Sequence, residues 1–512
     1  MAMNIASLLR DRARQQGDRP AIIEPGRTIS FAELDRAAAS AAARLSDAGI
    51  VRDMRVLLLA PMSIDLYTVL IGTCRLGAAV VFVDPSAGVR NVSACIAGAR
   101  PHAFVGVPRA HLLRLVSPSL RSVPVKLTIG NVVDSVSESR DAPLVQCQPD
   151  TPAVITFTSG ATGLPKGTAR THCFLLAQHR ALASTLALDA GDVDLATLPI
   201  VLLANLASGV TSVLPDADLR APGAIRAEPV VDQIHALGPG RIVATPALLE
   251  RLVTCLEQRG ERLNRVRHVF TGGAPVFPSL LDRVATATPG ASVVAVYGST
   301  EAEPIASLDR QDIAHDDRVA MREGAGLLAG RPEVGIDVRV LPDRWGQPAR
   351  MLSTDPQRDA LGANQPGEIV VAGEHVLRGY LDGNGDEETK IKTGDRVWHR
   401  TGDAGYFDLD GRLWLLGRCA ARVSDDDGIV YPFAVECAAS EVPGVHRSAF
   451  VSHRGRRLLV AEVTGEAADV RAVLMQRLSW ARLADVRIVR RVPVDHRHNA
   501  KVDYPALARM LG

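Results

Sequence analysis

The chain has 512 residues, which is too long for one ordinary core and predicts two to four structural units of about 150 residues each. Its composition, 47% hydrophobic and 22% charged, excludes general disorder. Lys and Arg number 58 against 57 for Asp and Glu, so the net charge gives no reason to expect a nucleic-acid partner. Any affinity for phosphate must come from a local site where backbone N–H groups and a few cations converge.

The first twenty residues are charged and lack the apolar segment of a secretory signal, which predicts a cytoplasmic protein. The most apolar stretch, residues 65–85, is interrupted by Arg75 and is typical of a helix followed by a buried strand, so we expect no membrane span. The seven cysteines show no CxxC pair and no metal-ligand spacing with histidine. We expect buried or free thiols.

Between residues 28 and 85, short β-rich runs alternate with helical runs, beginning with a strand and an Ala-rich helix. Such alternation predicts an α/β fold with βαβ units and mostly parallel sheets. The pattern recurs at 153–157, 241–246 and 291–298, each followed by a polar or Gly-rich turn. Open α/β sheets bind ligands at the carboxyl ends of their strands. These turns are therefore the predicted location of a site.

After Gly330 the pattern changes to short alternating strands separated by Gly, Asp and Asn turns, which predicts a smaller β-rich subdomain. From about Cys419 onward the chain has the pattern of a mixed α+β unit, with a helix near 467–483. We therefore predict an N-terminal domain over 1–417 and a C-terminal domain over 418–512.

The segment ITFTSGATGLPKGTARTH, residues 155–172, places three glycines, several hydroxyl residues and Lys166 directly after a predicted strand. Glycines let backbone amides approach phosphate oxygens, hydroxyls add donors, and the lysine supplies a positive charge. Pro165 stands where a P-loop needs its second glycine, so a Walker A site is disfavoured. A Gly- and Thr-rich surface loop is the alternative for this segment taken alone.

Two further strands end in polar or Gly-rich segments. Residues 297–304, YGSTEAEP, include Glu301, whose carboxylate suits Mg²⁺. The same residues also fit the start of a helix, with Ser299 or Thr300 as the cap. Residues 269–278, VFTGGAPVFP, carry two glycines that would let a flat group approach the backbone, or would simply form a turn.

Three charged residues follow toward the C-terminus. Asp403 comes after a Thr-Gly turn, and its carboxylate could accept two hydrogen bonds from a ribose diol. Arg418 ends a predicted strand and could donate to the same sugar or to phosphate. Taken singly, Asp403 fits a turn, Arg418 a surface charge, and Lys501 a solvated side chain.

The ordered series of motifs resembles the adenylate-forming superfamily, which includes acyl-CoA synthetases, luciferases and the adenylation domains of peptide synthetases. The resemblance covers essentially the whole chain. It implies a large N-terminal domain of two βαβ subdomains plus a β-barrel, followed by a small mobile α+β C-terminal domain. It also implies ATP and Mg²⁺ as cofactors, a small-molecule carboxylic acid as substrate, and adenylation without a protein nucleophile.

The resemblance further implies a role for each matching residue. Tyr297 would stack on adenine, Gly298 would belong to the same nucleotide-binding segment, and Thr300 and Glu301 would serve ATP and Mg²⁺, with Glu301 as metal ligand. Asp403 and Arg418 would bind the ribose. Lys501, Lys166 and Glu301 would be catalytic, Lys501 as a cation worth about 3 to 4 kcal/mol in the transition state. The β- and γ-phosphates would be held by Thr158, Ser159, Gly160, Thr162, Gly163 and Lys166. The adenine and the acyl pocket would be bordered by Gly273, Ala274 and Pro275.

The chain departs from many acyl-CoA synthetases at two places. Residues 198–209, LPIVLLANLASG, lack the histidine that those enzymes carry there, and Asn205 is a candidate polar contact in the acyl pocket. In GRCAAR, Ala421 replaces the usual hinge aspartate. Together with YGSTEAEP, PALLERL and HRHNAK, these segments are similar to the β-lactone synthetases of bacterial olefin biosynthesis.

Three functions therefore compete. The first is acyl transfer to a thiol, either coenzyme A or the phosphopantetheine of an acyl or peptidyl carrier protein. The second is closure of a β-hydroxy acyl-AMP to a β-lactone. The third is a non-catalytic nucleotide-binding scaffold, disfavoured because Lys166, Glu301, Asp403, Arg418 and Lys501 are all present. Few aromatic residues and the apolar run at 200–206 favour an aliphatic or fatty acid.

Overall fold

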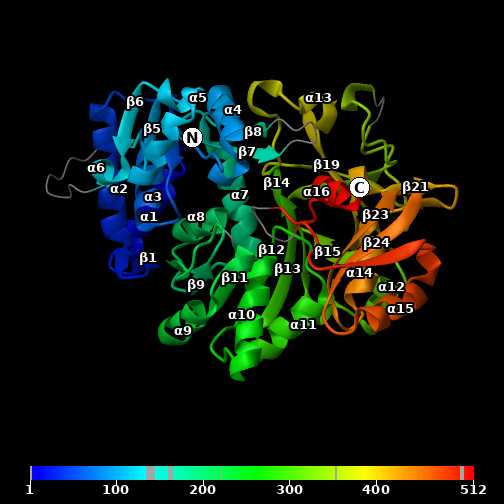
Figure 1. Cartoon of the computed structure of the whole chain (residues 1–512). Helices are drawn as coiled ribbons and strands as arrows, with labels where there is room; N and C mark the ends of the chain where they lie inside the picture. The colour runs from blue at the N-terminus through cyan, green and yellow to red at the C-terminus, as the bar shows by residue number, and fades with distance from the viewer. Residues whose placement is uncertain (1–2, 134–143, 160–164, 221, 352–354, 496–500) are drawn as a thin grey trace.

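The computed structural model arranges the chain as two neighbouring α/β lobes and a smaller C-terminal unit (Figure 1). Most of the blue-to-cyan elements form the first lobe, and the green elements form most of the second. The orange-to-red C-terminal unit lies against the second lobe. The structure describes residues 3–133, 144–159, 165–220, 222–351, 355–495 and 501–512.

The first lobe is built on a six-stranded sheet in the order β6-β5-β3-β4-β7-β8, parallel except for the last pair. Helix α2 starts at a capping box in which Ser30 and Glu33 exchange side-chain and backbone hydrogen bonds. The predicted alternation of strands and helices is confirmed. The bounds are β3 Arg55–Leu59, β4 Ala79–Val81, β5 Ala103–Gly106, β6 Val125–Thr128, β7 Pro152–Ser159, β8 Pro165–Thr171, α1 Ala6–Gln16, α2 Phe31–Asp47, α3 Ile64–Arg75, α4 Val89–Ala99, α5 Pro118–Arg121, α6 Ile129–Val133 and α7 His172–Thr185.

The second sheet has 14 strands, in the order β16-β17-β19-β20-β15-β14-β13-β12-β11-β9-β10-β1-β2, with β18 paired to β19. Strands β13 to β1 in that order are parallel, and the outer strands are antiparallel. The bounds are β1 Pro20–Glu24, β2 Arg27–Ser30, β9 Val193–Ala196, β10 Thr211–Val213, β11 Arg241–Ala244, β12 His268–Gly272, β13 Ser292–Ser299, β14 Ala302–Asp309, β15 Leu327–Pro332, β16 Ile336–Leu341, β17 Gly367–Gly373, β18 Lys390–Thr393, β19 Arg396–Phe407 and β20 Leu413–Arg418.

The antiparallel strands β15 to β20 are those that the sequence predicts as a smaller β-rich subdomain. They extend the parallel part of the second sheet at its β13 edge through β14. The helices of this lobe are α8 Pro199–Ser208, α9 Glu228–Leu237, α10 Pro246–Arg259, α11 Pro278–Ala287, α12 His315–Arg322 and α13 Asp386–Thr389.

The C-terminal unit is an α+β layer with a core of its own. Its three-stranded sheet, β23-β24-β25, packs on helices through Val435, Phe450, Leu459, Leu474 and Val486, all less than 2% exposed. The mixed α+β pattern is confirmed, although the helix expected near 467–483 ends at Arg477. The bounds are β21 Val423–Asp425, β22 Gly428–Val430, β23 Val445–His453, β24 Arg456–Val463, β25 Asp485–Val489, α14 Pro432–Ser440, α15 Ala467–Arg477 and α16 Tyr504–Leu511.

The cysteines are all free thiols, and every one except Cys173 is buried, as the sequence predicts. Within the described ranges, no helix is both long and apolar enough to cross a membrane.

Candidate active site

The ends of β7 and β13, which belong to different sheets, meet at Glu301. The Thr158 hydroxyl, near the end of β7, donates to Glu301 Oε1 at 3.3 Å. The Tyr380 hydroxyl donates to the same oxygen at 2.8 Å. The structure thus brings a predicted phosphate-loop residue and the predicted metal ligand into direct contact at the junction of the two lobes.

The helix that was the alternative for residues 297–304 does not form, so that interpretation is wrong. Strands β13 and β14 pair antiparallel, with Ser299 opposite Ala302, and Glu301 lies in the turn between them. The backbone carbonyl of Thr300 accepts a hydrogen bond from Arg170 in β8 at 2.9 Å. The turn is therefore tied to the first sheet by both its backbone and its carboxylate.

Lys166 lies at the start of β8, and its side chain is only 7% exposed. Its ammonium group donates to Glu388 Oε2 at 2.6 Å and lies 5.6 Å from the centre of the Tyr380 ring. Gly385 packs directly on this side chain, because a Cβ there would lie 2.7 Å from the Lys166 Nζ atom. The buried Lys166 ammonium group is thus paired with the half-exposed Glu388 carboxylate, and it lies near the ring of Tyr380, the residue that bonds Glu301.

A second buried lysine, Lys390, which the sequence analysis missed, also lies near the Tyr380 ring. Lys390 Nζ is 5.2 Å from the Tyr380 ring centre and 3.1 Å from His399 Nδ1, and it donates to the Leu377 carbonyl. Burial lowers the pKa of Lys390 to about 8, and the nearby Glu301 carboxylate acts in the opposite direction. The only feature of the sequence that could have indicated Lys390 was its pairing with His399, at inward positions of the strands β18 and β19.

Asp403 and Arg418, the two residues predicted to bind ribose, form an ion pair in the structure. Asp403 in β19 lies opposite Arg418, the last residue of β20, and accepts a hydrogen bond from its guanidinium at 2.9 Å. The Tyr297 hydroxyl donates to the other Asp403 oxygen at 2.8 Å. The Asp403 carboxylate raises the pKa of Arg418, and burial followed by that carboxylate raises the pKa of Tyr297. Asp403 lies inside a strand, so its interpretation as a turn residue is wrong.

Two Gly-rich segments end neighbouring strands beside Tyr297. Strands β12 and β13 are parallel, with Gly272 opposite Val296, and residues 273–275 continue from β12 next to Tyr297 and Gly298. A Cβ on Gly272 would lie 2.5 Å from the Val296 carbonyl oxygen, so the close strand approach requires glycine. Gly273, Ala274 and Pro275 therefore lie at the same sheet edge as the Tyr297–Asp403 pair.

Several predicted site residues lie outside the described part of the chain or away from the junction of the two lobes. Gly160, Thr162 and Gly163 lie outside the described residues, and of Ser159 the structure describes only its place at the end of β7. Asn205 is not a pocket contact, because it is fully buried and donates to Asp194 and Ser212 inside the lobe.

Lys501 is exposed and lies in the C-terminal unit. Its backbone pairs with Asp495 through hydrogen bonds of 2.8 and 3.0 Å. Burial and Glu436 raise the pKa of Tyr504, three residues further on, and the positive charge of Arg418 partly offsets that effect. The start of α16 is therefore within electrostatic reach of the predicted ribose pair.

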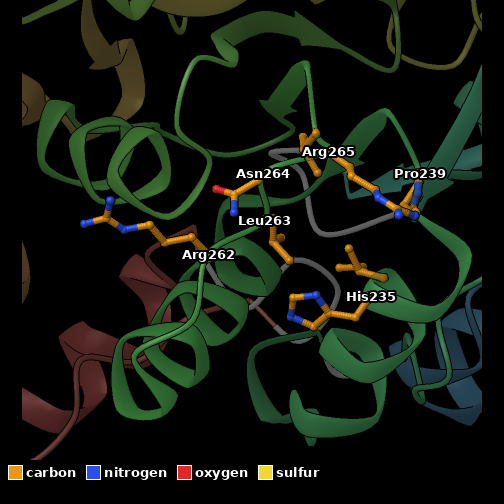
Figure 2. Close-up of a pocket in the computed structure, with 9 residues that line it drawn as sticks. His235, Pro239, Arg262, Leu263, Asn264 and Arg265 are labelled. Atoms are coloured by element: carbon orange, nitrogen blue, oxygen red, sulfur yellow. The ribbon is translucent and has the colours of Figure 1, made fainter.

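A surface cavity of about 350 Å³ contains none of the predicted site residues (Figure 2). It lies between the end of α9 and the segment after α10, where His235, Arg262 and Arg265 line it. It is therefore separate from the candidate site.

The residues at the junction fit Mg²⁺ and a nucleotide. In the part of the chain that the structure describes, no three His, Cys, Asp or Glu side chains form a metal cluster. Mg²⁺ needs no such cluster, since it is usually held by one or two carboxylates together with substrate phosphates and water. Glu301 would supply a carboxylate for Mg²⁺, Lys166 a buried cation for phosphate, and Asp403 an acceptor for a sugar diol.

Solved structures share this fold. The chain aligns with ATP-bound MatB from Rhodopseudomonas palustris at a TM-score of 0.82 and 21% identity, covering 100% of this chain and 99% of that one. At this identity the likeness shows the fold alone. It confirms the predicted α/β architecture with a separate small C-terminal domain.

Proteins of similar sequence identify the family to which the chain belongs. An "Olefin beta-lactone synthetase" from Stenotrophomonas maltophilia is 32% identical, with 99% of this chain and 97% of the relative covered. "4-coumarate-CoA ligase 1" from Narcissus pseudonarcissus is 26% identical, with 86% and 79% covered. Residues 9–381 match the family described as AMP-binding enzyme. The chain therefore belongs to the AMP-binding enzyme family and is an AMP-forming ligase.

Proposed function

We propose that this protein activates an aliphatic or fatty carboxylic acid with ATP, forming an acyl-AMP and releasing pyrophosphate. The observation that carries the proposal is the junction of the two lobes. There Thr158 and Tyr380 hold Glu301, and the buried Lys166 lies against the Tyr380 ring. A ribose-type pair, Asp403 and Arg418, joins the adjacent strands β19 and β20. A carboxylate for Mg²⁺, a cation for phosphate and acceptors for ribose are the groups that an adenylation site needs.

In the proposed reaction, a carboxylate oxygen of the acid attacks the α-phosphorus of ATP. A new phosphorus–oxygen bond forms, and the bond to the pyrophosphate oxygen breaks in line with it. Lys166 leaves Glu388 to bind the leaving phosphates, while Asp403 orients the ribose. Glu301 would hold Mg²⁺, which neutralises phosphate charge when bound. Lys501 would be the cation that stabilises the charge on the reacting carboxylate and α-phosphate.

We also propose that the C-terminal domain begins at residue 418, directly after Gly417, and moves as a unit. Gly417 has a φ of +104°, and Arg418 both ends β20 and bonds Asp403. A rotation at this point would change the distance between the Lys501 segment and the ribose pair. Ala421, at the position of the aspartate in the usual hinge motif, ends the short 3-10 helix Cys419–Ala421 that follows.

The first candidate for the second half-reaction is acyl transfer to a thiol. The sulfur of coenzyme A or of a carrier protein's phosphopantetheine would attack the acyl carbon, and AMP would leave. The relative named as a 4-coumarate-CoA ligase supports this candidate.

The second candidate is closure of a β-lactone. The hydroxyl oxygen of a β-hydroxy acyl-AMP would bond to its own carbonyl carbon, the bond from that carbon to the phosphate oxygen would break, and the hydroxyl proton would pass to a base. The relatives named as olefin β-lactone synthetases support it, because they align with 99% of this chain.

Pyrophosphate release with a panel of aliphatic acids and β-hydroxy acids, with and without coenzyme A, tests both steps. Acid-dependent release supports adenylation, and mass spectrometry of the products distinguishes acyl-CoA from β-lactone. Release that does not depend on any acid, or none across chain lengths with carrier protein added, would contradict the proposal.

A further inference from the structure

The Glu301 carboxylate is held on one side only. Both hydroxyl groups that bond it, those of Tyr380 at 2.8 Å and Thr158 at 3.3 Å, donate to Oε1. Within the described part of the chain, no donor bonds the other oxygen, Oε2. Fixing one carboxylate oxygen sets the direction in which the other one points. The shorter and more favourable of the two bonds comes from Tyr380.

Tyr380 is itself fixed on several sides. Its backbone N–H donates to Asp386 Oδ1 at 2.8 Å, and its backbone bridges to Thr168 in β8. The residue is 8% exposed, and the ammonium groups of Lys166 and Lys390 lie 5.6 and 5.2 Å from its ring centre. Ammonium groups at this distance are attracted to an aromatic ring. The ring therefore cannot turn away from Glu301 without losing contacts to both lysines.

We propose that Tyr380 is a positioning residue for Glu301: by holding Oε1, it leaves Oε2 as the oxygen that would bind the Mg²⁺ of the nucleotide. This inference rests on the proposed adenylation function. Tyr380 contacts neither ATP nor the acid in this role; it acts through the carboxylate. Because the carboxylate is already oriented, binding the metal does not have to freeze its rotation.

The test is a binding measurement with Mn²⁺ as the probe. The full-length protein is loaded with α,β-methylene-ATP, which cannot transfer its AMP group to an acid, and Mn²⁺ is titrated while free ion is followed by electron paramagnetic resonance. In Tyr380→Phe the Kd for Mn²⁺ is expected to rise about tenfold, the effect of one lost hydrogen bond to a charged group. Thr158→Val, which removes the longer bond, is expected to give a smaller rise and serves if Tyr380→Phe does not fold.

The matched control is Tyr406→Phe. The Tyr406 hydroxyl is also partly buried, but it donates to the Ala325 carbonyl at 2.9 Å and not to Glu301. This variant is expected to bind Mn²⁺ as the wild type does. Equal Kd values in Tyr380→Phe, Thr158→Val and wild type would overturn the positioning role, as would an equal loss in Tyr406→Phe.

Glu301→Gln separates this inference from the function on which it rests. If Glu301→Gln weakens Mn²⁺ binding and Tyr380→Phe does not, only the positioning role fails. If Glu301→Gln also binds Mn²⁺ normally, Glu301 is not the metal ligand, and both the proposed role of Glu301 and that of Tyr380 fail.

Discussion

Replacing His446 by glutamine tests how the C-terminal unit is held against the second lobe. His446 in β23 lies 3.3 Å from Glu250 in α10 and 3.3 Å from Glu462 in its own sheet. Hydrogen bonds to Glu250 and then to Glu462 raise its pKa from 6.5 to about 9. The imidazole is therefore charged at neutral pH, and it joins two parts of the chain that are far apart in sequence.

The size of the effect follows from linkage. A raised pKa means that the stabilisation is fully present below pH 6.5 and is lost as pH rises toward about 9. The full shift would correspond to about 3 kcal/mol. The side chain is 41% exposed, so solvent screens the pair and we expect about 1 kcal/mol. The positive charges of Arg283 and Arg447 also interact with the Glu250 carboxylate, so Glu250 does not depend on His446 alone.

Calorimetric unfolding at pH 6.5 and pH 9.5 measures this. The free energy of unfolding of His446→Gln is expected to be about 1 kcal/mol lower than that of the wild type at pH 6.5. At pH 9.5 the two free energies of unfolding are expected to be nearly equal. Glu250→Gln, which removes only the contact to α10, should show part of the same deficit. His453→Gln is the control, since burial and Arg487 lower rather than raise the pKa of His453. Equal deficits at both pH values in His446→Gln would refute the reasoning.

Three further changes have defined outcomes. Arg400→Met should lower the free energy of unfolding in urea by about 3 to 5 kcal/mol, because it leaves Glu368 buried without its partner at 2.7 Å, and a loss below 1 kcal/mol would contradict this. Glu388→Gln should lower the KM for ATP severalfold in a pyrophosphate-exchange assay by releasing Lys166, whereas an unchanged KM would show that the pair does not compete with phosphate. Lys501→Ala should lose acyl-AMP formation yet still consume a preformed acyl-adenylate, and equal loss of both activities would exclude a role confined to adenylation.

Local sequence patterns were sufficient to predict the strands and the polar residues at their ends. Strand β13 ends at Tyr297 to Ser299 as predicted, and the pairing of Asp403 with Arg418 follows from two strands joined by a short turn. The start of a helix at Glu301 was a wrong alternative, because a cap residue followed by a carboxylate also occurs in a tight turn between antiparallel strands.

Contacts between segments that are distant in sequence could not be predicted from such local patterns. Tyr380 bonds Glu301 from 79 positions away, and nothing local to either residue indicates the other. For Asn205 the local pattern predicted a contact that the structure does not contain. Its position in an apolar run suggested a ligand contact, but Asp194 from β9 lies 2.8 Å away and accepts its amide hydrogen. Whether a polar residue in a helix meets a ligand or a core carboxylate depends on tertiary packing alone.

The edge of the second sheet has a consequence for synthesis on the ribosome. Strand β1 pairs with β10, and the Thr211 hydroxyl bonds the Pro20 carbonyl from 191 residues away. At ribosomal rates of about 5 to 20 residues per second, β1 waits roughly 10 to 40 seconds for its partner to be made. Meanwhile α1 and α2 can already pack together, because they adjoin in sequence. Strand β2 follows at once and pairs with one edge of β1, so the edge that later meets β10 is the one left open in a growing chain. Binding of that edge by a chaperone would be most useful in this interval.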